Sequence, residues 1–302
     1  MAQVIAVTGG TGFVGQRLLR RAVEQGHVVR ALTRRPRPEH PCISWIEGDL
    51  HDADRLAKLC EGADAVIHIA GVINARTRDD FFRGNVEGTQ TMIEAAKAAD
   101  ARRFVHVSSL AAREPDLSVY GASKAAAEEV VRRSDLDWTI VRPPAVYGPG
   151  DRETFELFAL AKRGLALVPQ RGRGSWIHVD DLGDALLTLT RSGETGVTFE
   201  VDDGVPGGHD HAGFARLVGD AIGRKPLVVR VPKLGMLAGA AIQTAAARFT
   251  GELPKLSFDR ARYFAHPDWV ARGPAVPGWS PKIETREGLA ATATWYREQG
   301  WL

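Results

Sequence analysis

Cysteine is scarce in this sequence of 302 residues, which contains only Cys42 and Cys60. The two residues lack the paired spacing of metal ligands, so we expect no metal site and two free thiols, as in a reducing cytosol. A basic leader with a cleavage site is also missing, because an apolar run from Val4 leads directly into a glycine motif. These features predict a cytoplasmic protein rather than a secreted one.

Long hydrophobic runs and an excess of one charge are missing as well. The most apolar late segment, residues 234–249, is short and is interrupted by Gln243, Thr244 and Arg248, so it cannot span a bilayer. Lys and Arg number 39, against 37 Asp and Glu. Because these charges are dispersed, we expect no nucleic-acid and no membrane partner, and any basic patch must be local.

The first chemical signal is a glycine motif at the start of the chain. Gly9, Gly12 and Gly15 follow an apolar strand and open a helix that also contains Phe13 and Val14. Such glycines permit a tight turn, a close approach of the backbone to a pyrophosphate, and close packing of helix on strand. The alternative is an ordinary glycine-rich turn, but the placement favours a dinucleotide site that also includes Thr11.

Strand-like and helix-like segments alternate after this motif, in a chain whose 44% hydrophobic content can fill a large core. The alternation predicts an α/β fold with a doubly wound parallel sheet of the Rossmann type. We expect residues 1–150 to form the dinucleotide-binding domain, with further sheet elements from about 175–202. Residues 151–302 are expected to form mainly a smaller, interleaved substrate-binding lobe. Predicted strands are 27–33, 42–47, 65–69, 103–107, 138–142, 166–168 and 199–201, and predicted helices are 53–60, 81–100, 118–133, 155–163, 180–190, 211–222 and 233–249.

Two arginines follow the second predicted strand, where the ribose of a dinucleotide should lie. An acidic residue at this position, about 20 residues beyond the glycines, is typical of NAD-binding folds, but here Thr33 precedes Arg34 and Arg35. Guanidinium groups bind phosphate in a planar, bidentate way, so the pattern favours NADP over NAD. The alternative is that both arginines are solvated loop residues.

A Tyr-x-x-x-Lys pair follows the fifth predicted strand, which ends in Ser108 and Ser109. On a helix this spacing places the Tyr120 phenol and the Lys124 ammonium on one face. The pair occurs by chance on amphipathic helices, but its position in a dinucleotide-binding fold favours a catalytic role. His68, inside a predicted strand, is expected to be a packed core histidine.

The ordered set of motifs resembles an extended short-chain dehydrogenase/reductase of the NAD-dependent epimerase/dehydratase family, over nearly the whole chain. Besides the glycine motif and the Tyr-Lys pair, it comprises Gly48-Asp49-Leu50, His68 to Gly71, Asn85-Val86-x-Gly88-Thr89, Ser108-Ser109, Arg142-Pro143 to Gly150, Val179-Asp180-Asp181 and Gly278-Trp279-Ser280-Pro281. Two departures argue against a nucleotide-sugar substrate. The interval from Ser109 to Tyr120 is short, and residues 165–176 lack the usual run before the Val-Asp-Asp motif.

The resemblance implies a role for each matching residue. Ser109 is the catalytic hydroxyl, Tyr120 is the general acid/base, Lys124 is its partner, and Asn85 is structural. Because Lys124 and the positive nicotinamide of the oxidised cofactor both favour a phenolate, we expect the pKa of Tyr120 to fall. Asp49 and Leu50 would lie against the adenine. The remaining implied dinucleotide contacts are Ala70, Gly71, Val107, Tyr120, Lys124, Pro143, Ala145 and Val146.

The sequence thus predicts an NADP-dependent oxidoreductase (NAD possible) that interconverts a carbonyl and an alcohol of a small or apolar substrate. One alternative is a nucleotide-sugar epimerase or dehydratase, which oxidises its substrate only transiently. Another is a non-catalytic NADP-binding regulator or structural subunit. The helices at 81–100 and 118–133 carry alanine-rich faces, and in the family the corresponding pair forms a dimer interface, so a homodimer is possible. Tyr147, Arg152, Arg173 and Trp176 are candidate walls of the substrate site.

Overall fold

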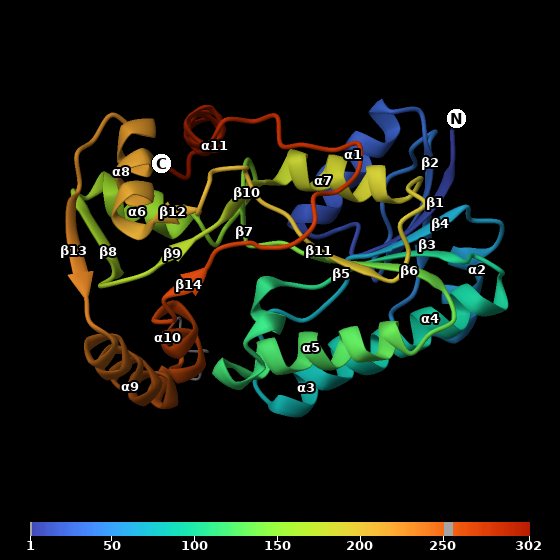
Figure 1. The fold of residues 1–302 in the computed structure, drawn as a ribbon, viewed down its shortest axis with the longest axis horizontal. Coiled ribbons are helices and arrows are strands. Elements are labelled where there is room, and N and C mark those ends of the chain that lie inside the picture. The colour runs from blue at the N-terminus through green and yellow to red at the C-terminus, as the bar shows by residue number, and fades with distance from the viewer. Residues whose placement is uncertain (1, 251–255) are drawn as a thin grey trace. The chain divides into compact units, whose positions relative to one another are not determined.

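The structure is a computed structural model that describes residues 2–250 and 256–302 (Figure 1). The chain forms two compact units. The first consists of Met1–Pro143, Val179–Val201 and Arg272–Ser280, and the second of Pro144–His178, Asp202–Ala271 and Pro281–Leu302. The chain therefore passes several times between the units, and each is described on its own below.

A seven-stranded parallel sheet forms the centre of the first unit, with the strand order β11-β6-β5-β4-β1-β2-β3. Its strands are β1 (Val4–Thr8), β2 (Val28–Thr33), β3 (Ile43–Glu47), β4 (Ala65–His68), β5 (Arg103–Val107), β6 (Asp137–Arg142) and β11 (Val197–Glu200). The order reverses between β1 and β4, which is the point where doubly wound sheets bind their ligands. The predicted fold class is confirmed.

Helices cover both faces of this sheet (Figure 1). α1 (Phe13–Glu24) and α7 (Val179–Leu189) pack together on one face. The other face carries α2 (Ala53–Cys60), α4 (Gly88–Ala98) and α5 (Val119–Arg132). Under the second set lies a core of buried apolar side chains that includes Leu56, Val66, Met92, Phe104 and Ile140. Burial on both faces explains why these strands are continuous apolar runs in the sequence.

The single helix predicted over 81–100 is wrong in detail. The chain instead forms α3 (Arg78–Phe82), a π-helical turn (Arg83–Glu87) and then α4. The wider π turn contains Asn85, whose side chain bonds the backbone of Val72 across the loop after β4. π turns are rare and are common at functional sites, and this one positions a side chain that a regular helix would present differently.

The described residues of the second unit form short strands and five helices. Its strands are β7 (Ala145–Tyr147), β8 (Leu165–Pro169), β9 (Arg173–Gly174), β10 (Trp176–His178), β12 (His209–Asp210), β13 (Leu227–Val231) and β14 (Asp268–Trp269). Its helices in the described residues are α6 (Phe155–Lys162), α8 (His211–Ala221), α9 (Lys233–Thr250), α10 (Phe258–Phe264) and α11 (Thr285–Glu298). β7 pairs with β10, β8 with β13, and β9 with both β12 and β14.

Aromatic side chains fill the core of this unit. Tyr147, Phe158 and Tyr296 are wholly buried, and Trp176 stacks on Phe214 with ring centroids 3.7 Å apart. Tyr147 therefore belongs to the packing of this unit, which corrects its interpretation as a wall of a substrate site, whereas the same interpretation of the half-buried Trp176 stays a prediction. Three of its strands, β7, β9 and β10, are missing from the strands predicted from the sequence.

No helix in residues 2–250 or 256–302 has both the length and the apolar character needed to cross a membrane. Cys42 and Cys60 are free thiols, and Cys60 is buried, which raises the pKa of its thiol to about 12.

Candidate active site

The glycine motif forms a tight turn between β1 and α1. Gly9 adopts φ +76°, and a Cβ there would lie 2.7 Å from the backbone nitrogen of Ala70, at the start of the loop after β4. A Cβ on Gly15 would overlap the carbonyl oxygen of Gly9. These two glycines are therefore required by the backbone itself, because any side chain would separate α1 from the strands.

In the described residues, no side chain accepts a hydrogen bond from the free backbone N–H groups at the N-terminus of α1. Gly12 is the N-cap residue, and no side chain in the described chain caps this helix. The first N–H groups of a helix, here those of Phe13, Val14 and Gly15, have no intrahelical partner and carry the positive end of the helix dipole. Because Gly12 has no side chain, the pyrophosphate of a dinucleotide can approach these N–H groups. Thr11 is half-buried beside it, and its carbonyl accepts a hydrogen bond from Gln16.

Arg34 and Arg35 lie directly after β2, with both side chains exposed. The Thr33 hydroxyl folds this corner, because it donates to the Arg35 carbonyl (2.6 Å) and accepts from the Arg35 N–H (3.3 Å). In the part of the chain that the structure describes, no carboxylate pairs with either guanidinium. Both are therefore available to an external phosphate, and their role at a ribose 2′-phosphate stays a prediction.

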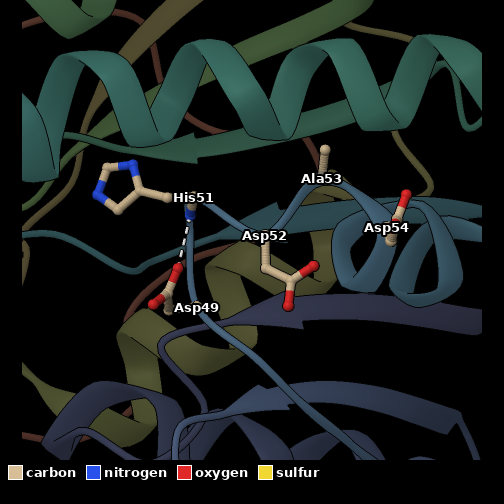
Figure 2. A pocket seen from close by; sticks show the side chains of 5 residues that line it. All are labelled: Asp49, His51, Asp52, Ala53 and Asp54. Atoms are coloured by element: carbon tan, nitrogen blue, oxygen red, sulfur yellow. Dashed lines mark hydrogen bonds between the residues drawn. The ribbon is translucent and has the colours of Figure 1, made fainter.

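Asp49 lies at the carboxyl end of β3, where it borders a shallow pocket (Figure 2). Its carboxylate accepts the backbone N–H of His51 at 2.8 Å, which fixes the turn into α2. Leu50 points toward the core, and a Cβ on Gly88 would lie 2.8 Å from its side chain. The pocket is lined by Asp49, His51, Asp52, Ala53 and Asp54. Three carboxylates repel a phosphate, so this pocket suits the amino group of an adenine better than the phosphates.

A buried chain of hydrogen bonds holds the loop that follows β4. The Ala70 N–H donates to Thr8 Oγ1 (3.2 Å), and Thr8 Oγ1 lies 2.7 Å from His68 Nδ1. On the other side of the ring, His68 Nε2 lies 3.1 Å from Thr89 Oγ1, which donates to the Asn85 carbonyl. With Thr89 donating, the imidazole carries its proton on Nε2 and accepts on Nδ1.

His68 has the environment of a core histidine. Its side chain is wholly buried, and burial lowers the pKa of the imidazole to about 3, so that the ring is neutral. The ring of His106 on β5 stacks against it at 5.5 Å. The two rings lie at paired positions of β4 and β5, and the buried, neutral and hydrogen-bonded ring of His68 fits a packed core histidine.

The side chain of Asn85 connects the loop after β4 to α5. Its Oδ1 accepts the Val72 N–H at 2.6 Å, and its Nδ2 donates to the Val72 carbonyl (3.0 Å) and to Ser123 Oγ (2.8 Å). Ser123 in turn donates to the Tyr120 carbonyl. Asn85 therefore has the structural position that was expected for it. It also brings Gly71 close to α5, because a Cβ on Gly71 would lie 3.6 Å from Lys124 Nζ.

The two serines after β5 have different partners. Ser108 is buried and donates to Glu128 Oε1 at 2.5 Å. Ser109 is partly exposed, caps the helical turn Leu110–Arg113 through the Ala111 N–H, and hydrogen-bonds the side chain of Tyr120. The structure thus brings Ser109 to Tyr120 and turns Ser108 away, which fits the catalytic assignment of Ser109; that assignment itself stays a prediction.

Lys124 lies one helical turn after Tyr120 and is almost fully buried. Its ammonium donates to the Val107 carbonyl at 2.7 Å. Burial lowers the pKa of Lys124 to about 8, while the charge of Glu128 acts in the opposite direction. Val107, a predicted dinucleotide contact, therefore holds the lysine at the end of β5.

The predicted fall in the pKa of Tyr120 is wrong for the chain by itself. Burial raises the pKa of the phenol, and the hydrogen bond from Ser109 only partly offsets that effect. The phenol is therefore protonated at neutral pH, which is the form that can donate a proton. The prediction relied on Lys124 and on the positive nicotinamide of the oxidised cofactor together, and in the chain by itself the lysine directs its ammonium to a backbone carbonyl.

A buried ion-pair network centred on Glu128 holds α5 in place, and it was not predicted from the sequence. Glu128 is wholly buried on α5 and accepts hydrogen bonds from Ser108, Arg132 and both Nε and Nη2 of Arg142. Arg142 also pairs with Glu200 on β11. A signal did exist, because Glu128 follows Lys124 by four residues and so lies on the same helix face.

The remaining predicted contacts fall in both units. Pro143 is buried at the end of the first unit, where its carbonyl accepts the Leu110 N–H at 3.0 Å. Ala145 and Val146 belong to β7 of the second unit, a strand that is not among the predicted ones. Within residues 2–250 and 256–302, no three side chains group together as metal ligands.

Comparison with known proteins agrees with this geometry. The model of the NAD dependent epimerase/dehydratase family matches residues 5–201. A ceramide reductase of Caulobacter vibrioides is 40% identical over 99% of this chain and 96% of its own. A putative dihydroflavonol 4-reductase of Synechocystis is 28% identical, over 100% of this chain and 97% of its own. The crystal structure of gox2253 has the same fold, with a TM-score of 0.78 and 23% identity over 99% of both chains. The chain therefore belongs to the NAD-dependent epimerase/dehydratase family of extended short-chain dehydrogenases/reductases and is an oxidoreductase.

Proposed function

We propose that the protein uses NADPH to reduce a ketone in a ceramide-like lipid, that is, a long-chain N-acyl amino alcohol. The observation that carries the substrate class is the 40% identity to a ceramide reductase over nearly the full length of both chains. The absence of the features typical of nucleotide-sugar enzymes between Ser109 and Tyr120 and in residues 165–176 also favours an apolar substrate.

The first unit supplies the groups that such a reduction requires. When bound, the nicotinamide supplies the hydride that forms the new C–H bond at the carbonyl carbon. The Ser109 hydroxyl holds the ketone oxygen, and the Tyr120 phenol donates its proton to that oxygen, so that the ketone becomes a secondary alcohol. In the complex with the dinucleotide, unlike in the chain by itself, the Lys124 ammonium and the positive nicotinamide both favour the phenolate that remains until a proton returns.

The test is a reduction assay with the purified protein, NADPH and an N-acyl amino ketone in detergent micelles. We expect one NADPH to be consumed for each molecule of product formed. Mass spectrometry should show that the product contains two hydrogen atoms more than the ketone. If NADPH is bound but no ketone is converted, a regulator or structural subunit becomes the better interpretation.

The main alternative is an epimerase or dehydratase, for which the same three side chains would suffice. It is separated by cofactor use, because transient oxidation returns the hydride to the substrate and consumes no dinucleotide. Incubation with a panel of nucleotide sugars and NAD should give no product. Conversion of one of them without net cofactor change would replace our proposal.

For the cofactor, we infer a preference for NADPH over NADH. Arg34 and Arg35 are exposed beside Thr33, where an acid would bind the ribose of NAD. We expect the double variant Arg34→Ala with Arg35→Ala to lose about 10- to 100-fold in NADPH affinity and little in NADH affinity, since only NADPH has the phosphate that the arginines pair with. Calorimetric titration measures both.

Arg37 offers a matched control for this pair, because it is also exposed and lies two residues further along the same loop. Arg37→Ala should leave the preference unchanged. Equal affinities of the parent protein for the two cofactors, or the same loss in the control, would contradict the assignment of the 2′-phosphate.

We further propose that the enzyme acts in the cytoplasm, which the two free thiols support, and that α4 and α5 pair with those of a second copy in a homodimer. The substrate-binding role of the second unit is part of the same proposal.

A further inference from the structure

The second unit exposes most of the large apolar side chains that the protein leaves in solvent. Of the nine such side chains in the described residues, seven belong to this unit: Leu167, Leu227, Val229, Leu234, Ile242, Phe258 and Phe264. Scattered single residues of this kind are normal, but a concentration on a few neighbouring elements marks an interaction surface.

The two-stranded sheet β8–β13 carries the first part of this surface. Leu167 of β8 lies beside Val229 of β13, and Leu227 follows on the same face because side chains alternate along a strand. These three are 50%, 38% and 67% exposed. On β8, the neighbours of Leu167, Ala166 and Val168, are buried on the opposite face, where α6 and α8 pack.

The helix α9 carries the second part and follows β13 after a single residue (Figure 1). Leu234 and Ile242 are 80% and 71% exposed. They recur at helical spacing with three exposed alanines, so that one side of the helix is apolar and in solvent: Ala238, Ala241 and Ala245. Met236, Leu237 and Ala240 lie on the inward side, and α10 packs against α9. Both the inward side and the exposed side of α9 are therefore apolar, and such a helix needs an apolar partner that covers its exposed side.

The charges of the segment that carries β13 and α9 are all positive. Residues 221–250 contain no Asp or Glu, and four of their cations are exposed: Arg224, Lys225, Arg230 and Lys233. In the described part of the chain none of these four pairs with a carboxylate. Exposed apolar residues next to cations, without acids, favour the surface of an anionic bilayer, where the cations meet lipid phosphates and the apolar side chains enter the acyl boundary.

We propose that β13 and α9, with Leu167 of β8, dock the second unit onto an anionic membrane surface. The inference rests on the proposed function, because a ceramide-like substrate resides in a membrane and an enzyme that reduces it must reach that membrane. The contact is peripheral, since no described helix can span a bilayer. It departs from the expectation of no membrane partner, because the overall charge is dispersed while this segment is basic.

The experiment is cosedimentation of the intact protein with phosphatidylglycerol vesicles and with phosphatidylcholine vesicles. We expect binding to the anionic vesicles that weakens as salt is added. The double variant Leu234→Asp with Ile242→Asp should bind the anionic vesicles with an affinity lower by about tenfold or more, because two apolar contacts become anionic. Val28→Asp is the control, since Val28 is 47% exposed but lies in the first unit. Melting temperatures verify that each variant is folded.

Docking is overturned if the wild-type protein does not sediment with anionic vesicles, or if Val28→Asp loses as much binding as the α9 variant. It is also overturned if the α9 variant merely converts a dimer to a monomer in sedimentation velocity while vesicle binding persists, because a second copy would then cover this face.

A reductase assay separates this inference from the proposed function. The α9 variant should keep wild-type kcat on a short, water-soluble amino ketone and lose activity only on the lipid in vesicles. A wild-type protein that reduces the ketone in micelles but ignores vesicles refutes docking alone. A protein that binds vesicles but converts no ketone refutes the proposed activity and leaves docking supported.

Discussion

Tyr120→Phe is expected to lower kcat for the NADPH-dependent reduction by about 10²- to 10⁴-fold, the range that a positioned general acid contributes. The substitution removes only the phenol hydroxyl, so the ring still fills its place between Phe81 and the end of β5. Affinity for NADPH should change little, since the glycine turn, Arg34, Arg35 and Asp49 lie on other elements. Steady-state kinetics and calorimetry measure the two effects.

Tyr296→Phe provides the contrasting control. Tyr296 is wholly buried in the second unit, where its hydroxyl donates to the Asp151 carbonyl at 2.6 Å. Losing this hydrogen bond should destabilise the protein by about 1–3 kcal/mol while leaving kcat near the wild-type value. Tyr120→Phe should show the reverse, with an unchanged melting temperature and a collapsed kcat. If Tyr120→Phe retains full turnover, the acid/base role belongs to another group.

The strands of the sheet and the helix α5 could be predicted because local sequence patterns determine them. Ala53–Cys60 and Arg103–Val107 have the predicted bounds, since Asp52 caps the one and the other is a fully buried run. The Tyr120–Lys124 spacing similarly required only the geometry of one helix. The expected oxidoreductase class of the family is confirmed, whereas the individual site residues stay predictions.

The second unit could not be predicted to the same extent. Its strands β9, β12 and β14 contain two residues each, which is too few for any periodicity. They exist because segments distant in sequence pair, as His209 does with Gly174. The ion pairs of Glu128 and the raised pKa of Tyr120 could not be predicted for the same reason, because both depend on which groups the fold places around α5.

Glu128→Gln is expected to have the largest effect on stability, lowering the melting temperature by about 5–10 °C. The carboxylate is wholly buried and holds Arg142 through two hydrogen bonds of 2.8 and 2.7 Å. Glutamine keeps the shape but turns one acceptor into a donor and removes the charge, so the half-buried guanidinium loses its main partner. Breaking a buried ion pair lowers the free energy of unfolding by about 3–5 kcal/mol. In a chain of this size, such a loss corresponds to a fall in melting temperature of about 5–10 °C.

Glu129→Gln is a control of the same chemistry one residue away. Glu129 pairs with Arg132 as well, but its side chain is 55% exposed, and exposed pairs contribute about 1 kcal/mol or less. Its melting temperature should stay within about 2 °C of the wild-type value. Equal melting temperatures for the two variants would mean that the buried network adds nothing to stability.

The pH dependence of this difference identifies its electrostatic origin. The hydrogen bonds from Arg142 and Ser108 lower the pKa of Glu128 below its usual value, which is about 4.3 in an unfolded chain. A carboxyl with a lowered pKa stabilises the fold fully above the unfolded value and loses this effect as pH falls through the folded one. The gap in melting temperature between wild type and Glu128→Gln should therefore be full at neutral pH and close in acid below about pH 4. Thermal unfolding across this range measures it, and a gap that does not change with pH would assign the effect to packing instead of charge.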